Sequence, residues 1–273
     1  MNATQAFPSF DVLLSDLNQF TLQLVEAYRT GKIKSWDDLE EKVSVYFTSE
    51  RMEQIEAVAP GWRKMASYAD GVTLVHVMCV FLGLFIMPEF LSMTKKQQQI
   101  MKWIILFHDI EKEPEQGKRD HVHAFRSAVT TARALPKLGF AVTSEYDSLI
   151  GGWDEFTRFA VTKPKDSTDY IQDNQKLPTI LGGIERMFGQ NTPTALIIKT
   201  VLFHLSVDMQ SWPPAAPLTD KEVTMYFDGE LATLLKAMNL GDSEGWNMFK
   251  QDREYLRNDT LESFKRVEQL ISK

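Results

Sequence analysis

Apolar residues recur at spacings of three and four along almost the whole chain, and no sustained run alternates between apolar and polar positions. The first spacing places apolar side chains on one face of a helix, whereas strict alternation is typical of a half-buried strand. The pattern therefore predicts an all-α protein.

The predicted helices cover residues 10–28, 36–46, 49–58, 67–87, 95–111, 121–138, 179–188, 194–207 and 246–271. A further helix is expected after the capping-box sequence Thr219-Asp220-Lys221-Glu222. We expect one domain, 1–273, with a helical extension at 1–60, a core at 66–241 and a C-terminal helix at 246–271. Residues 139–175 are rich in Gly, Thr, Asp and Lys and contain only short apolar stretches, which predicts an irregular insertion or lid at 139–178.

Composition and charge narrow the choice of partners. With 273 residues, 44% of them hydrophobic, the chain can bury a full core. Its net charge of -7 argues against general binding to nucleic acid or to an anionic membrane. The apolar run 72–87 contains His76 and falls short of the roughly 20 residues that span a bilayer, so a buried helix is expected. The N-terminal residues show no targeting pattern, and we expect a cytoplasmic protein.

Isolated polar residues interrupt the two most apolar helices. His76 lies within Thr73-Leu74-Val75-His76-Val77, and His108-Asp109 follows a nearly continuous apolar block from Ile100 to Phe107. Burying an ionised aspartate without a partner costs several kcal/mol. Histidine and aspartate together offer the nitrogen and oxygen ligands that suit transition metals, so a metal would satisfy both residues.

These residues carry a resemblance to a known family. His76, then His108-Asp109, then Asp228 resembles the H…HD…D pattern of the HD superfamily of metal-dependent phosphohydrolases, over residues 68–241. The segment 104–112, with His108-Asp109 followed by Ile110-Glu111-Lys112, is similar to the family's apolar-HDIGK motif, with Glu111 in place of the usual glycine. Asp228 is identified within the segment 226–235, which resembles the family's closing helix.

Two further histidines extend the resemblance to members that bind two metals. His123, in His123-Ala124-Phe125-Arg126-Ser127-Ala128, resembles the H-x-x-x-(Gly/Ser)-Ala segment, and His204 ends another apolar run. The resemblance implies that His76, His108, Asp109 and Asp228 hold one ion, and that Asp109 bridges to a second ion held by His123 and His204. The expected cofactors are two divalent ions of Mn, Fe, Ni, Co or Mg.

His121 competes with His123, because the two side chains point to nearly opposite faces of a helix. The spacing to Ser127-Ala128 favours His123. Asp208, one turn after His204, is either a residue that orients the His204 imidazole or a solvated residue before the proline-rich break.

Basic residues follow the central ligands and suggest where a substrate binds. We expect catalytic roles for Asp109 and Lys112, and we expect Lys118, Arg119 and Arg126 to contact a phosphorylated substrate. Solvent exposure is the competing interpretation for Lys118 and Arg119.

Three functions fit these residues. The first is a metal-dependent phosphohydrolase that acts on a small phosphate ester or nucleotide. The second is a di-iron oxygenase of an inositol or organophosphonate-like substrate, since the resemblance implies the same six ligands for that chemistry. The third is a regulator that binds a metal or nucleotide without turnover. The ligand pattern does not separate the three.

Overall fold

The computed structural model describes residues 7–67, 72–113, 120–153, 155, 158, 160–165 and 169–273. Its helices in this part of the chain, from the N-terminus, are η1 (Phe10–Val12), α1 (Leu17–Arg29), α2 (Trp36–Tyr46), α3 (Ser49–Val58), α4 (Trp62–Ser67), α5 (Val72–Ile86), α6 (Pro88–Leu91), α7 (Lys95–Phe107) and α8 (His123–Lys137). They are followed by α9 (Tyr146–Ile150), η3 (Asn174–Lys176), α11 (Leu177–Phe188), α12 (Pro193–Phe203), α13 (Asp220–Tyr226), α14 (Gly229–Asn247) and α15 (Arg253–Ile271). The all-α prediction is confirmed.

The described strands are two residues long each. β1 (Val161–Thr162) and β2 (Ile171–Gln172) pair antiparallel within the segment that the sequence predicts to be an irregular insertion. This segment also contains α9 and η3, so part of it is regular.

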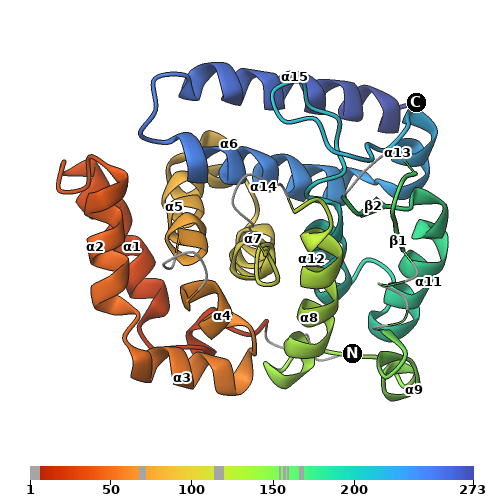
Figure 1. Cartoon of the computed structure of the whole chain (residues 1–273), viewed down its shortest axis with the longest axis horizontal. Helices are drawn as coiled ribbons and strands as arrows, with labels where there is room; N and C mark the ends of the chain where they lie inside the picture. The colour runs from red at the N-terminus through yellow and green to blue at the C-terminus, as the bar shows by residue number, and fades with distance from the viewer. Residues whose placement is uncertain are drawn as a thin grey trace.

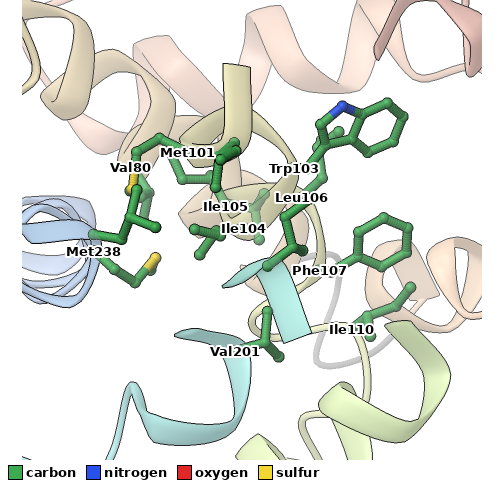
Figure 2. Close-up of a cluster of buried hydrophobic side chains, with 14 of the residues drawn as sticks. Val80, Met101, Trp103, Ile104, Ile105, Leu106, Phe107, Ile110, Val201 and Met238 are labelled. Carbon is green, nitrogen blue, oxygen red and sulfur yellow. The ribbon is translucent and has the colours of Figure 1, made fainter. Parts of the chain in front are cut away.

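Helix α7 occupies the centre of the core. It contacts α5, α8, α12 and α14, which explains why its last turns are apolar on every side. Figure 2 shows Val80 of α5, Val201 of α12 and Met238 of α14 around the α7 side chains. In Figure 1, α14 and α15 run side by side along the top of the view, with α5, α7 and α12 beneath them.

Helices α5 and α14 approach each other closely because glycines form much of their contact. A Cβ atom on Gly83 would lie 2.7 Å from Cβ of Glu244, and one on Gly241 would lie 3.2 Å from Val80. A Cβ atom on Gly245 would overlap Val80 and the imidazole of His76. The close approach brings the end of α14 against the histidine of α5.

Several helix ends differ from the sequence-based expectation. The helix predicted over 95–111 ends at Phe107, and the helix predicted over 194–207 ends at Phe203, so His108 and His204 occupy the C-cap positions of α7 and α12. Trp246 belongs to α14, and the C-terminal helix begins at Arg253 rather than at residue 246. Among the described residues, no helix combines the length and apolar character that crossing a membrane requires.

Candidate metal centre

Six buried or partly buried side chains form two adjoining groups of potential metal ligands. One group consists of His76, His108 and Asp242, and the other of Asp109, His123 and His204; within each group the ligand atoms lie within 4.8 Å of one another. Five of these six residues, all except Asp242, are at most 3% exposed.

Asp109 joins the two groups through its two carboxylate oxygens. Oδ1 lies 3.0 Å from Nε2 of His123 and 3.8 Å from Nε2 of His204. Oδ2 lies 3.5 Å from Nε2 of His76 and 3.6 Å from Nε2 of His108. This placement agrees with the bridging position that the resemblance implies for Asp109.

Three of the histidines are oriented by a backbone carbonyl three residues earlier. Nδ1 of His108 lies 2.8 Å from the carbonyl oxygen of Ile105. The same distance is 2.7 Å from His123 to Asp120 and 2.7 Å from His204 to Val201. In each case the carbonyl belongs to the same turn of the chain as the histidine. A carbonyl oxygen only accepts hydrogen bonds, so each Nδ1 carries a proton. The Nε2 atom of each neutral ring therefore presents a lone pair to the centre.

His76 is held differently, because it lies inside α5 and its Nδ1 has no hydrogen-bond partner. Its ring stacks on Trp246 with a centroid distance of 4.1 Å and an interplanar angle of 15°. Trp246 in turn stacks on Trp36 at 5.8 Å. The absent side chain of Gly245 leaves the space that the imidazole fills.

The arrangement fits a cation, because acceptor atoms face one another without donors. Nε2 of His76 and His108, Oδ1 of Asp109 and Oδ1 of Asp242 are buried and make no hydrogen bond. Nε2 of His123 and Nε2 of His204 are 3.1 Å apart, although the proton of each neutral ring is on Nδ1. Buried polar atoms are rarely left unpaired in folded proteins, and a divalent cation in each group would pair them.

Burial and the neighbouring charges shift the pKa values of the histidines in different directions. Burial and the nearby His123 and His108 lower the pKa of His204 to about 3, so this ring is neutral near pH 7. Burial also lowers the pKa of His76. Burial opposes protonation of His108 as well, but Asp109 and Asp242 outweigh it and raise the pKa of His108 overall.

The two carboxylates stay ionised although burial opposes this. The neighbouring His108 and the ammonium group of Lys112 hold the pKa of Asp109 well below its usual range. His108 and His76, whose Nε2 atoms lie 3.7 Å and 2.9 Å from Oδ1 of Asp242, do the same for the pKa of Asp242. Nζ of Lys112 lies 2.6 Å from Oδ2 of Asp109 and 5.1 Å from the centre of the Trp246 ring, so the predicted catalytic lysine is beside the centre.

A cavity of about 460 Å³ opens onto the two groups. The ligands His123, His204 and Asp242 reach it together with Lys112 and Asp120. Its other walls come from the segment between α12 and α13, from α14 and from Thr260 of α15. Among the described residues of 139–178, which the sequence predicts to form a lid, none lines this cavity; Leu205, Met209 and Trp212 line it instead.

The prediction of Asp228 as a ligand is wrong, and Asp242 takes its place. Asp228 is the N-cap of α14, where its carboxylate accepts a hydrogen bond of 2.8 Å from the backbone N–H of Leu231. Asp242 follows fourteen residues later on the same helix, about 21 Å further along its axis. The apolar positions Leu234, Leu235, Met238 and Leu240 precede Asp242, but Asn239, Ser243 and Glu244 lie close to it, so the sequence does not mark it as an isolated polar residue in the way that it marks His76.

The expected substrate contact of Arg126 is also corrected. Its guanidinium binds the carboxylate of Asp120 and the carbonyl oxygen of Glu111, and it lines a separate cavity on the other side of α8. Lys118 and Arg119 lie outside the described residues. His123, and not His121, joins the ligand groups.

Asp208 does not orient His204. Its exposed carboxylate pairs with Arg266, and Nδ1 of His204 binds the Val201 carbonyl. The sequence did not predict a place in the site for Asp242, Trp246 or Asn239. The amide Nδ2 of Asn239 donates a hydrogen bond of 3.2 Å to the carbonyl oxygen of His204.

Comparison of the chain with family models, with curated proteins and with solved structures gives no match.

Proposed function

We propose that this protein is a metal-dependent phosphohydrolase that hydrolyses a small phosphate ester, as its resemblance to the HD superfamily implies. The supporting observation is the convergence of His76, His108 and Asp242 with Asp109, His123 and His204 on one side of an open cavity. Two divalent cations at such a centre supply Lewis acidity and activate water at neutral pH.

Asp109 has the central positioning role in this proposal. Its two oxygens face different ligand groups, so this one carboxylate would help to hold both cations. The anchored rings of His108, His123 and His204 need no rearrangement to present their lone pairs. Such preorganisation lowers the cost of holding highly charged species in a buried site.

Lys112 has the role of stabilising negative charge on the phosphoryl group. Lys112 lines the cavity. Burial lowers the pKa of Lys112, but Asp109 outweighs this effect and raises the pKa above its usual value. An ammonium group so placed can donate to a phosphoryl oxygen while it stays within reach of Asp109. Charge that develops during phosphoryl transfer would be neutralised in part by this lysine.

Metal-loaded protein tests this function directly. The purified chain is stripped of metal, loaded with Mn²⁺ or, without oxygen, with Fe²⁺, and assayed for phosphate release from a panel of phosphate monoesters and nucleotides. We expect metal-dependent release that Asp109→Asn abolishes and that Lys112→Met lowers about a hundredfold without loss of metal. His121→Gln is the matched control and should keep its activity.

Oxygen consumption by the iron-loaded protein with a polyol or organophosphonate, without phosphate release from any ester, would overturn the proposal in favour of the oxygenase. Full metal occupancy without either reaction would support the regulator.

A further inference from the structure

The cavity over the metal centre combines polar and apolar walls. The candidate ligands His123, His204 and Asp242 line it together with Lys112. Its apolar lining consists of Leu205, Met209, Trp212 and Trp246, and the Trp246 ring lies directly beside Lys112. Apolar and aromatic walls gain free energy by covering apolar ligand surface, whereas they offer no hydrogen bonds to a charged group.

The charges in the cavity match a single phosphoryl group. Among the described residues that line the cavity, Lys112 is the only one with a positively charged lysine or arginine side chain. Asp120 and Asp242 add negative charge. Arg126 pairs with Asp120 and lines a different cavity. A nucleoside triphosphate carries several negative charges, and the described lining offers them one ammonium group beside two carboxylates.

One buried acceptor in the wall lacks a donor. Asn239 is 4% exposed, and its Nδ2 donates to the carbonyl oxygen of His204. Because that carbonyl only accepts, the amide cannot be reversed, and Oδ1 is the free end. Oδ1 is buried without a hydrogen-bond partner in a residue that lines the cavity. A bound molecule that brings an O–H or N–H group to this atom would remove the desolvation cost.

We infer that the substrate is a phosphate monoester of a small apolar or aromatic alcohol, with one phosphoryl group at the metals and one hydrogen-bond donor that reaches Asn239. Trp212 and Trp246 then contact the apolar part. This inference rests on the proposed phosphohydrolase function and narrows its substrate to the apolar monoesters.

Binding of inert phosphonates tests the inference without turnover. Isothermal titration calorimetry on the Mn²⁺-loaded protein, at one fixed salt concentration, compares phenylphosphonate with methylphosphonate and with a methylene-bridged analogue of adenosine triphosphate. Burial of the phenyl ring should make phenylphosphonate bind about tenfold tighter than methylphosphonate or better. Equal affinities for the two phosphonates, or tightest binding of the triphosphate analogue, would overturn the inference.

Two variants assign the preference to the walls. Trp212→Ala should cost phenylphosphonate about tenfold in affinity and leave methylphosphonate unchanged. Tyr255→Ala is the matched control, because it removes an exposed aromatic ring of α15 that does not line the cavity. It should change neither affinity. Loss of affinity for both phosphonates in Trp212→Ala to the same extent would show that Trp212 is not an apolar contact.

Asn239 is tested with a ligand that carries the donor. Phenylphosphonate bearing a hydroxymethyl group should bind tighter than the parent compound, and Asn239→Leu should remove this difference. Unchanged binding of the parent compound to the variant shows that the site is intact. A preference for the hydroxylated compound that survives in Asn239→Leu would contradict the role of Asn239.

The phosphonate results separate this inference from the proposed function. If phenylphosphonate binds as expected but no ester is hydrolysed, the apolar site stands and the phosphohydrolase proposal fails. If phosphate is released faster from glycerol phosphate or nucleotides than from phenyl phosphate, the phosphohydrolase stands and this inference fails.

Discussion

The histidines of this centre are held in two different ways. His108 and His204 cap the C-terminal ends of α7 and α12, where carbonyl groups lack helical partners, and each Nδ1 binds the carbonyl three residues earlier. His123 begins α8 and binds the carbonyl of Asp120 in the same manner. His76 lies within α5, where no such carbonyl pairs with its Nδ1, and it depends on Gly245 and Trp246 of α14.

The orientation of three histidine rings therefore depends on local contacts, whereas the orientation of His76 depends on long-range contacts. A local anchor forms wherever its own turn forms, so it persists when distant parts of the fold shift. The position of His76 depends instead on the close packing of α5 on α14, since the residues that confine it are about 170 positions away in the sequence. We therefore expect the ion held by His76, His108 and Asp242 to be more sensitive to changes in helix packing than the other ion.

The largest effect should come from Asp109→Asn, which removes the carboxylate shared by both groups. The metal content of protein loaded with Mn²⁺ and dialysed should fall from about two ions per chain to one or fewer, because the His123 and His204 group loses its only carboxylate and the His76 and His108 group loses a carboxylate oxygen that faces it. Inductively coupled plasma mass spectrometry measures the content, with His121→Gln as the control. Retention of two ions in Asp109→Asn would contradict the bridging position.

The second prediction tests the packed histidine by itself. In Gly245→Ala the new methyl group overlaps Val80 and lies 2.7 Å from Cε1 of His76. We expect unfolding to become easier by about 1–3 kcal/mol and the metal content to fall toward one ion per chain. Urea denaturation and metal analysis measure the two effects.

The matched control for Gly245 is Gly182, a glycine inside α11 with open space around its Cβ position. Gly182→Ala should leave the metal content unchanged and should stabilise the protein slightly, since alanine is favoured over glycine within helices. If Gly245→Ala keeps two ions while it is destabilised, then His76 is oriented by Trp246 and not by the glycine.

The third prediction concerns the anchored His204 in metal-free protein. Its pKa is about 3 in the folded chain, whereas an unfolded histidine titrates near 6.5. The unfolded state therefore binds more protons between these values, and stability falls as the pH falls below about 6.5, by up to about 1.4 kcal/mol per pH unit for this residue.

Urea denaturation of metal-free protein between about pH 7 and pH 5 measures this slope. Because His76 contributes in the same direction and His108 in the opposite one, the test compares variants. His204→Gln should lower the pH dependence by nearly one proton per molecule. An unchanged slope would show that His204 is not buried as a neutral ring.

The sequence predicted most of the centre because its ligands are conspicuous there. His76, His108-Asp109 and His204 are isolated polar residues in apolar helices, and a buried position for each follows from this pattern. The choice of His123 over His121 also agrees with the ligand groups in the structure. The all-α fold followed from the same spacing of apolar residues.

The remaining features depend on contacts that spacing does not reveal. Asp228 and Asp242 are both acidic residues of one helix, and only the packing of α14 on α5 decides which one reaches the histidines. The apolar cavity wall forms where residues 205–212 fold against α14, and the direction of Arg126 depends on its pairing with Asp120. These are tertiary contacts between segments far apart in the chain.

The smallest effect is expected at Asp228, the N-cap of α14, which the sequence predicts as a ligand and which the structure places outside the two groups. Asp228→Ala removes an N-cap that accepts from the backbone N–H of Leu231, which should cost about 1 kcal/mol of stability. The metal content should stay near two ions per chain, because the carboxylate lies about 21 Å along the helix from Asp242.

Asp242→Ala is the companion variant and should lose one ion, since it removes the only carboxylate of the His76 and His108 group. Metal analysis and urea denaturation of both variants distinguish a helix cap from a ligand on the same helix. Loss of metal in Asp228→Ala with full retention in Asp242→Ala would reverse the assignment, and it would mean that α14 is shifted along its axis relative to α5.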